Sequence, residues 1–295
     1  MTLVFCPDPW YIGRKQSMTD TEGGGSMHPV AATALILGAL TAVYLFLIAP
    51  GRRPEQLKEF RVTLYAHRGL WNDRRPENSR AAFSAAVEKG YGIETDVRVS
   101  ADGKLFLLHD DSLRRMTGDD RSAGSLTMEE LSGLKLNGTH ETIPTFDELL
   151  NIVGGKVPLI IEIKTGPRVK TTCRLTDERL RSYRGQYMVE SFDPRAVRWF
   201  RKHSPGTIRG QLAMGVPGDS SRKRSFRFFL LSSLAVDVIG RPHFIAMRHD
   251  AVDSLPMRLV RLFHPYLVAW TVRSPERMRE LENRYDCRIF EGFEP

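Results

Sequence analysis

Cysteine is scarce in this chain, and its three cysteines, Cys6, Cys173 and Cys287, stand far apart. Their odd number and wide spacing predict no disulfide framework, which favours a reducing compartment. The chain also lacks zinc-finger spacing and any strip that mixes aromatic with basic residues, so we predict no nucleic-acid partner. An anionic membrane surface or a phosphorylated substrate remains as an explanation for the formal net charge of +8.

Charged side chains are absent from Pro29 to Gly51, and Val30 to Ala49 is almost continuously apolar. Such a run is about long enough to cross a bilayer as a helix. A buried core helix is one alternative, although core helices rarely stay apolar on every face for this length. A signal peptide is the other, but no Lys or Arg immediately precedes the run and no small-residue cleavage site ends it. We therefore predict one membrane-spanning helix over residues 29–50.

Basic residues are more numerous after this run than before it. Arg52, Arg53, Lys58 and Arg61 follow it, whereas only Arg14 and Lys15 precede it. Because basic residues flank the cytoplasmic side of membrane helices, we predict a single-pass protein of the cell membrane with its catalytic domain in the cytoplasm.

The segments on either side of the predicted span carry no helical or strand pattern. Residues 1–28 are interpreted as a disordered tail or a misannotated extension, because EGGGS just before Met27 could be the translation of a purine-rich, ribosome-binding-like stretch. Residues 51–61 are interpreted as a linker.

The remaining residues, 62–295, alternate strand-like with helix-like stretches, which predicts a mostly parallel sheet. The chain has no glycine-rich dinucleotide fingerprint, and about nine strands favour a closed TIM (β/α)8 barrel with one strand added as a short hairpin. The expected strands are Val62–His67, Ile93–Val99, Lys104–His109, Val157–Lys164, Tyr187–Ser191, Ile208–Leu212, Phe244–Met247, Leu267–Val272 and Arg288–Phe290. The expected helices are Ser79–Lys89, Thr145–Val153, Val169–Arg184, Pro194–His203, Arg222–Val236 and Pro275–Glu282.

The hairpin, residues 93–111, carries an unusual set of polar side chains. A two-residue turn at Asp102-Gly103 would place Asp96 directly opposite His109. Glu94 lies two residues before Asp96 and therefore shares its strand face. Burying two carboxylates together is costly unless a cation or a proton compensates their charge. The hairpin therefore indicates a metal and acid–base site.

Other polar residues stand at the ends of the predicted strands, where barrel enzymes place their active sites. They are His67, Arg68, Glu77 and Asn78 after the first strand, Glu162 and Lys164 at the end of PLIIEIK, and Trp270 in LVAWTV. A single histidine at a strand end is more often structural. Two histidines, three acids, an arginine and a lysine at equivalent ends favour a functional site.

These motifs resemble the glycerophosphodiester phosphodiesterase family. The resemblance covers residues 62–295 and rests on several motifs in the family's order: AHRG, PEN, ETDV followed by a DG turn, LLHDDSLRRMTG, IPTFDELL, IIEIK and AWTV. Matches in this order and spacing are far more specific than one short motif. Two positions depart from the family pattern, with Ser79 where Thr is common and Arg273 where Asn is usual.

The resemblance implies a TIM barrel that holds a divalent metal at its mouth. By it, Glu94, Asp96 and Glu162 are the metal ligands, with Glu77 close by, and His67 and His109 are the general acid and base in an order the sequence leaves open. Arg68 and Lys164 would contact the substrate phosphate, and Asn78 and Trp270 would lie near the substrate. In the family, a glycerol hydroxyl attacks the phosphorus and a cyclic phosphate is then hydrolysed.

General chemistry agrees with these roles. An all-carboxylate set suits Ca²⁺ or Mg²⁺, not the nitrogen and sulfur ligands of structural zinc. A cation with two basic side chains would neutralise a phosphodiester, and two histidines could carry the protons. The expected activity is hydrolysis of glycerophosphodiesters to an alcohol and glycerol 3-phosphate, in phospholipid metabolism.

Two other functions stay open. One is a membrane-facing phospholipase of the C or D type that acts on lysophospholipids or other lipid diesters. It is favoured if the basic and apolar stretches from Arg222 to Leu231 and from Arg258 to Tyr266 meet membrane lipids and so turn the barrel mouth toward the headgroups. The same stretches could instead be barrel helices with a solvated basic face. The other function is a non-catalytic binder of phosphodiesters, which the presence of every proposed catalytic residue disfavours.

Overall fold

The computed structural model describes residues 28–60, 63–215 and 226–295, with the side chains of residues 226–228 also outside the description. The chain divides into two compact units, residues 1–41 and 42–295. Helix α1 (Pro29–Ile48) is long and apolar enough to cross a membrane, and only 6% of its most apolar window is buried. This exposure argues against a buried core helix. The length and composition fit a membrane span or a signal sequence.

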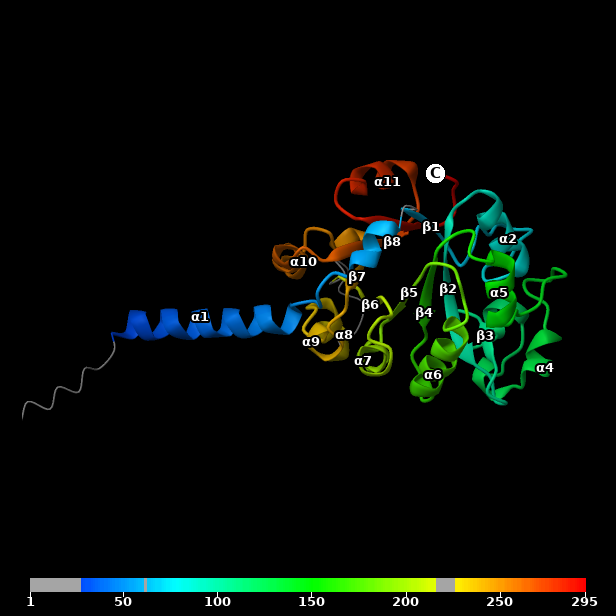
Figure 1. Cartoon of the computed structure of the whole chain (residues 1–295), viewed down its shortest axis with the longest axis horizontal. Coiled ribbons are helices and arrows are strands. Elements are labelled where there is room, and N and C mark those ends of the chain that lie inside the picture. Colours follow the sequence, from blue (N-terminus) through cyan, green and yellow to red (C-terminus); the bar gives the residue numbers. More distant parts are fainter. Residues whose placement is uncertain (1–27, 61–62, 216–225) are drawn as a thin grey trace, which may run out of the picture. The chain divides into compact units, whose positions relative to one another are not determined.

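The second unit is built on a parallel barrel (Figure 1). Eight strands follow the order β1-β9-β8-β7-β6-β5-β4-β2, and pairing of β1 with β2 closes the ring. The ninth strand, β3, pairs antiparallel with β2 and lies outside the ring. The TIM barrel with a hairpin addition is therefore confirmed. The strands are β1 (Leu64–His67), β2 (Gly92–Val99), β3 (Leu105–Leu107), β4 (Leu159–Ile163), β5 (Tyr187–Ser191), β6 (Arg209–Ala213), β7 (Phe244–Arg248), β8 (Tyr266–Val272) and β9 (Cys287–Phe290).

Helices connect the strands and cover the outside of the barrel (Figure 1). Side chains cap several of them: Asp193 accepts a hydrogen bond from the backbone N–H of Arg195, and Ser274 from that of Arg277, each just before a proline in the first turn. The α-helices are α2 (Arg80–Glu88), α3 (Arg114–Thr117), α4 (Met128–Ser132), α5 (Phe146–Val153), α6 (Val169–Leu180), α7 (Pro194–His203), α8 (Phe226–Ser232), α9 (Asp237–Gly240), α10 (Leu255–Val260) and α11 (Pro275–Leu281). The 3₁₀ helices are η1 (Glu55–Glu59), η2 (Ala123–Ser125), η3 (His249–Ala251) and η4 (Arg261–Phe263).

Alternation along the strands separates the two faces of the barrel wall. Outward side chains such as Ile93 and Ile161 join the large core beneath the helices. Inward side chains such as Tyr65, Ile160 and Phe244 form a second core that fills the barrel. Inward positions nearer the carboxyl ends of the strands are largely polar and include Glu94, Asp96, Glu162 and Glu190.

The segment before the first strand closes the opposite end of the barrel. Leu57, in η1, is 2% exposed and belongs to the same cluster as Tyr65 and Phe244 at the beginnings of their strands. Phe60 packs against this cluster. The chain thus reaches the barrel at the end where the parallel strands begin, opposite the polar mouth.

The hairpin is offset by one residue from the predicted register. Val97 lies opposite Leu107 and Val99 opposite Leu105. The backbone N–H of Ser100 donates to the carbonyl of Lys104 at 2.9 Å, so the loop has three residues, with Gly103 at φ 79°. A three-residue loop that ends in a left-handed glycine is a common alternative to the two-residue turn. The predicted pairing of Asp96 with His109 is therefore wrong, and Asp96 instead accepts a backbone hydrogen bond from Leu108.

Candidate active site

Three carboxylates from two neighbouring strands meet inside the mouth of the barrel. Asp96 of β2 lies beside Glu162 of β4 in the parallel register, and Glu94 is two residues earlier on β2. One carboxylate oxygen from each lies within 4.8 Å of the others, and all three residues are buried. Residues on adjacent parallel strands reach the same height in the barrel, which explains why acids far apart in sequence converge here.

Two basic side chains lie against these acids. The Lys164 Nζ is 2.9 Å from the Glu162 Oε1 and 3.2 Å from the Asp96 Oδ1. The Arg68 Nε is 3.3 Å from the Asp96 Oδ2. Burial alone would raise the pKa of Asp96, but Lys164 and Arg68 hold that pKa well below its usual value. Asp96 is therefore ionised.

Glu94 behaves differently from Asp96. Burial raises its pKa well above the usual value, and the charges on Asp96 and Glu162 raise it further. Burial also raises the pKa of Glu162, although Lys164 opposes the change. Both shifts favour the protonated carboxyl groups, because burial and mutual repulsion oppose their ionisation.

A fourth carboxyl group, Glu190 of β5, was missed by the sequence analysis. It lies beside Glu162 in the strand register and is 3% exposed. Burial and the charge on Glu162 raise its pKa well above the usual value. Its place two residues after the inward-facing Met188 in a strand could have revealed it. With all four carboxyl groups ionised, the two cations would leave two negative charges, the amount that a divalent cation neutralises.

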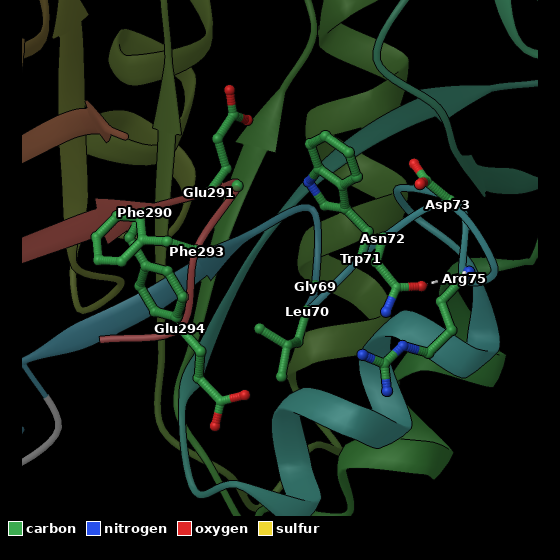
Figure 2. Close-up of a pocket in the computed structure, with 11 residues that line it drawn as sticks. Gly69, Leu70, Trp71, Asn72, Asp73, Arg75, Phe290, Glu291, Phe293 and Glu294 are labelled. Atoms are coloured by element: carbon green, nitrogen blue, oxygen red, sulfur yellow. Dashed lines mark hydrogen bonds between the residues drawn. The ribbon is translucent and has the colours of Figure 1, made fainter. Parts of the chain in front are cut away.

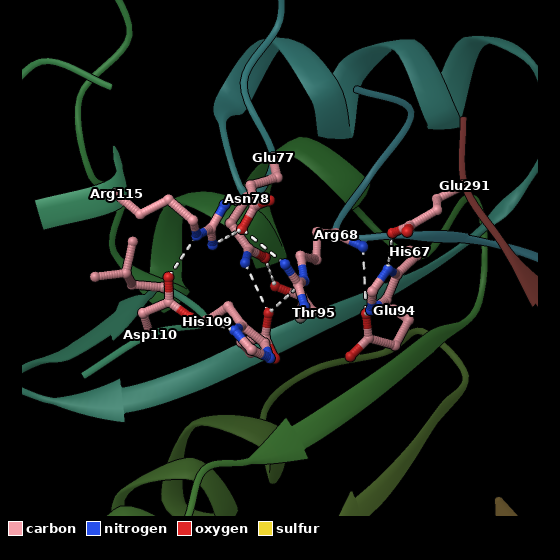
Figure 3. Close-up of polar contacts among 12 residues, drawn as sticks. His67, Arg68, Glu77, Asn78, Glu94, Thr95, His109, Asp110, Arg115 and Glu291 are labelled. Atoms are coloured by element: carbon pink, nitrogen blue, oxygen red, sulfur yellow. Dashed lines mark hydrogen bonds and ion pairs between the residues drawn. The ribbon is translucent and has the colours of Figure 1, made fainter. Parts of the chain in front are cut away.

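The loop after β1 supplies Glu77 and Asn78. The Asn78 Nδ2 donates to the Asp96 Oδ2 at 2.8 Å, and its Oδ1 accepts from the Thr95 Oγ1 at 2.8 Å (Figure 3). Asn78 has a φ of 53°, a conformation that asparagine tolerates better than most residues. It therefore orients Asp96. Glu77 accepts a hydrogen bond from the Arg68 Nη1 at 2.9 Å.

His67 is held by a residue that the sequence analysis did not select. Its Nδ1 contacts the Glu291 Oε2, and its Nε2 lies 3.7 Å from the Glu94 Oε2 (Figure 3). The Arg273 Nε donates to the other oxygen of Glu291 at 2.6 Å. Burial opposes ionisation of Glu291, but His67 and Arg273 lower its pKa to about 2. Glu291 directly follows the last strand, a position that could have indicated a role.

His109, like His67, contacts a carboxylate that also binds an arginine. Its Nδ1 is 2.7 Å from the Asp110 Oδ1, and the Asp110 Oδ2 accepts from the Arg115 Nε at 2.5 Å. Arg115 also binds both oxygens of Glu77 at 3.0 and 2.6 Å (Figure 3). Burial lowers the pKa of His109, as it does that of His67. In both rings a carboxylate contacts Nδ1 and so fixes the tautomer, which leaves Nε2 as the other nitrogen that can bind a proton.

Trp270 lies on another part of the barrel wall. Its Nε1 donates to the carbonyl of Ala246 at 3.0 Å, and its ring packs edge-on against Phe192 with centroids 5.5 Å apart. Phe192 directly follows β5. No contact joins Trp270 to the acid cluster among the described residues. These two rings give the mouth an apolar wall.

A pocket of about 330 Å³ lies beside Glu291, between the loop after β1 and the C-terminal residues (Figure 2). Its charged lining residues, Asp73, Arg75, Glu291 and Glu294, carry both signs, and none of the three clustered acids reaches it. A second pocket, also about 330 Å³, is lined by Lys164 with Arg98 and Arg168. The second pocket is the more basic of the two.

The residues of the cluster fit a divalent cation. All of the available donor atoms are carboxylate oxygens, the set that hard cations prefer. The Asp96 Oδ1 and the Glu162 Oε1 are buried and contact the Lys164 Nζ, and each oxygen keeps a lone pair that could bind a cation. The excess negative charge supplies the electrostatic reason for a cation to bind.

The chain is similar to known proteins in its sequence and its fold. The model of the glycerophosphoryl diester phosphodiesterase family matches residues 67–285. The chain belongs to this family. Its members are phosphoric diester hydrolases that act on glycerophosphodiesters and generally depend on a divalent metal.

Individual proteins agree with this assignment. A Bacillus subtilis (strain 168) protein, provisionally named a glycerophosphodiester phosphodiesterase, is 26% identical over 234 residues, which cover 74% of this chain and 89% of the relative. A Thermotoga maritima glycerophosphodiester phosphodiesterase has 26% identity and a TM-score of 0.62 over 78% of this chain and 94% of its own. An Oleispira antarctica phosphodiesterase, solved with its product sn-glycerol-3-phosphate, shares the fold with a TM-score of 0.66 at 22% identity, over 79% of this chain and 94% of its own.

The acid cluster predicts stabilisation by a divalent cation. Ca²⁺ or Mg²⁺ at about 100 times its dissociation constant should stabilise the full chain by about 2.7 kcal/mol. The double variant Glu94→Gln/Glu162→Gln should lose this effect, because two of the ligand carboxylates are gone. Thermal unfolding in detergent micelles, with and without the cation, measures it.

The double variant Glu88→Gln/Glu129→Gln is the matched control, since it removes the same charge from exposed positions. Equal stabilisation of both double variants by the cation would contradict binding at the cluster.

Proposed function

We propose that this chain hydrolyses glycerophosphodiesters to an alcohol and glycerol 3-phosphate with a divalent cation and two histidines. The observation that carries the proposal is the pair of partly buried histidines beside one acid cluster, each with a carboxylate at Nδ1. The product of the Oleispira antarctica phosphodiesterase, sn-glycerol-3-phosphate, supports the choice of product.

Glu94, Asp96 and Glu162 would hold the cation, and their oxygen donors favour Ca²⁺ or Mg²⁺. When bound, the cation neutralises negative charge on the phosphate. Arg68 and Lys164 would share that work: both already lie against Asp96, and each can donate to phosphate oxygens. Negative charge that develops in the transition state would meet donors that are already in place.

The histidines would carry the protons at Nε2. One takes a proton from the attacking glycerol hydroxyl, and the other gives a proton to the departing alcohol as a cyclic phosphate forms. Water then opens the cyclic phosphate to glycerol 3-phosphate, with the two proton-transfer roles reversed. Glu291 and Asp110 keep the Nδ1 of each ring protonated, so that Nε2 is the atom free to exchange. Trp270 and Phe192 would contact the carbon atoms of the substrate through the apolar wall.

His67→Ala and His109→Ala should each lower turnover of glycerophosphocholine by roughly 10²–10⁴-fold, because each removes a proton carrier. His140→Ala is the control, since His140 is exposed and makes no side-chain contact among the described residues. Released glycerol 3-phosphate is measured enzymatically. Turnover that survives the loss of both histidines would exclude this mechanism.

Glu291→Gln should lower kcat by about 10–100-fold with little change in KM, because His67 loses its partner while the binding residues remain. Arg273→Gln should have a smaller effect, since it leaves the contact of Glu291 with His67 intact. Steady-state kinetics of the two variants provide the comparison. A rise in KM at constant kcat would show instead that Glu291 acts in substrate binding.

The site of chain attachment favours water-soluble substrates over lipid diesters. We propose that residues 29–50 anchor the protein in the cell membrane, that residues 62–295 form a cytoplasmic catalytic domain, and that residues 51–61 link them. The backbone N–H of Gly51 donates to the carbonyl of Pro242, just before β7, at 2.7 Å. The chain therefore leaves the span at the end of the barrel opposite the mouth.

The exposed apolar residues of the stretch from Arg258 do not lie at the mouth. Leu262 and Phe263 are in η4, which precedes β8 and so lies near the end where the strands begin. The proposal that this stretch turns the mouth toward lipid headgroups is not supported, and the side chains of residues 222–227 lie outside the described structure.

In nanodiscs, the full chain should hydrolyse glycerophosphocholine with a higher kcat/KM than lysophosphatidylcholine in the same bilayer, because the mouth would face water. Glycerol 3-phosphate and lysophosphatidic acid are the respective products, and mass spectrometry separates them. Preference for the lysolipid would favour the phospholipase function.

A further inference from the structure

A basic groove lies between α7 and α9, far from the catalytic residues. Its volume is about 490 Å³, and its lining residues are Arg198, Arg201, Lys202, Val238 and Ile239. The two apolar residues come from the short helix α9, and the three cations come from the second half of α7. Because barrel helices run opposite to the strands, the end of α7 lies at the end of the barrel where the strands begin.

No carboxylate contacts the three cations in the described part of the chain. Arg201 donates only to the carbonyls of Val238 and Ile239, at 3.4 and 3.3 Å. Arg198 and Lys202 are exposed. Solvated basic residues at the end of a helix are common, because they complement its dipole. These three, however, also border a hollow with an apolar wall.

Two further arginines add to the positive charge. Burial and the nearby Arg201 lower the pKa of Arg209 to about 10 and also lower the pKa of Arg241. The acid among these groups is Asp237, and burial raises its pKa well above the usual value. The groove therefore has an uncompensated positive field, which suits an anion.

The groove adjoins the end of the apolar helix α1, whose residues from Ala42 on belong to the same unit as the barrel. The Arg241 Nη1 donates to the carbonyls of Phe46 and Ala49 at 2.9 and 2.6 Å, and its guanidinium lies over the Phe46 ring. The Tyr44 hydroxyl donates to the carbonyl of Ser233, close before α9, at 2.8 Å. Ile239 of the groove is two residues from Arg241, so both belong to one corner of the barrel.

We propose that this groove binds the phosphate of an anionic phospholipid headgroup at the surface of the bilayer that α1 enters. The inference rests on the proposed membrane span but not on the proposed reaction. The cations would bind the phosphate, while Ile239, which is 37% exposed, would meet the outer part of the acyl region. Such binding would hold the amino-terminal end of the barrel against the membrane and keep the catalytic mouth toward water.

The test compares the full chain in nanodiscs of phosphatidylcholine with nanodiscs that also contain phosphatidylglycerol. The anionic lipid should raise the midpoint of thermal unfolding by roughly 2–4 °C, because it binds the folded state. The triple variant Arg198→Gln/Arg201→Gln/Lys202→Gln should lose most of this shift. The control Lys104→Gln/Lys156→Gln/Lys170→Gln removes the same charge from exposed positions elsewhere and should keep it.

Several outcomes would overturn the proposal. One is an unchanged shift in the groove variant, and another is an equal loss in the control, which would mean that total charge alone matters. A third is an equal shift produced by inorganic phosphate in phosphatidylcholine nanodiscs, which would mean that the groove takes a soluble anion. Release of the chain from the nanodiscs would overturn both the span and the groove. Turnover of glycerophosphocholine, followed in all variants, should equal that of the wild-type chain. Absence of turnover in the wild-type chain would contradict the proposed reaction but not the proposed groove.

Discussion

The mouth of the barrel is organised by the electrostatic cost of burying four carboxyl groups together. Arg68 and Lys164 lie against Asp96 and lower its pKa, whereas burial and the neighbouring acids raise the pKa values of Glu94 and Glu190. A barrel can bear this cost because its apolar cores lie elsewhere, outside the strands and at the opposite end of the interior. A divalent cation would reduce the electrostatic repulsion among the acids, so its binding would stabilise the folded protein.

The two histidines depend on this arrangement in equivalent ways. Each ring is fixed by a carboxylate, and each carboxylate also binds an arginine, Arg273 for Glu291 and Arg115 for Asp110. The two pairs differ in sequence separation: Glu291 is 224 residues from His67, whereas Asp110 is next to His109. Glu77 joins Arg115 to Arg68, so one network of ion pairs connects His109 to the arginine that lies against Asp96.

The two ends of the barrel carry different sets of residues. The carboxyl ends of the strands hold the acids and histidines, and the amino ends hold Leu57, the groove cations and the residues that contact the end of α1. Parallel strands make this separation possible, because every strand contributes its last residues to one end and its first residues to the other. The proposed attachment to a membrane at one end would therefore leave the proposed active site at the other end undisturbed.

Much of the fold and of the candidate site could be predicted from local sequence patterns. Alternation of strand and helix predicted the barrel, strand-end motifs predicted Glu94, Asp96, Glu162 and both histidines as neighbours, and a charge-free run predicted the apolar helix. These features depend on the residues near them in sequence. The hairpin register was mispredicted, because two-residue and three-residue turns fit the same Asp102-Gly103 pair and differ only in backbone hydrogen bonds.

Only the tertiary structure decided the contacts between residues that are far apart in the sequence. The partnership of His67 with Glu291 spans 224 residues, and no spacing rule predicts it. Glu190 became part of the acid cluster only through the register of β4 with β5. The groove likewise lies next to the end of α1 because Arg241 donates a hydrogen bond to the carbonyl of Ala49, which is 192 residues away in the sequence. The sequence by itself determined which residues are candidates for the active site, because their types and strand positions are local, whereas closure of the barrel decided which of them contact one another.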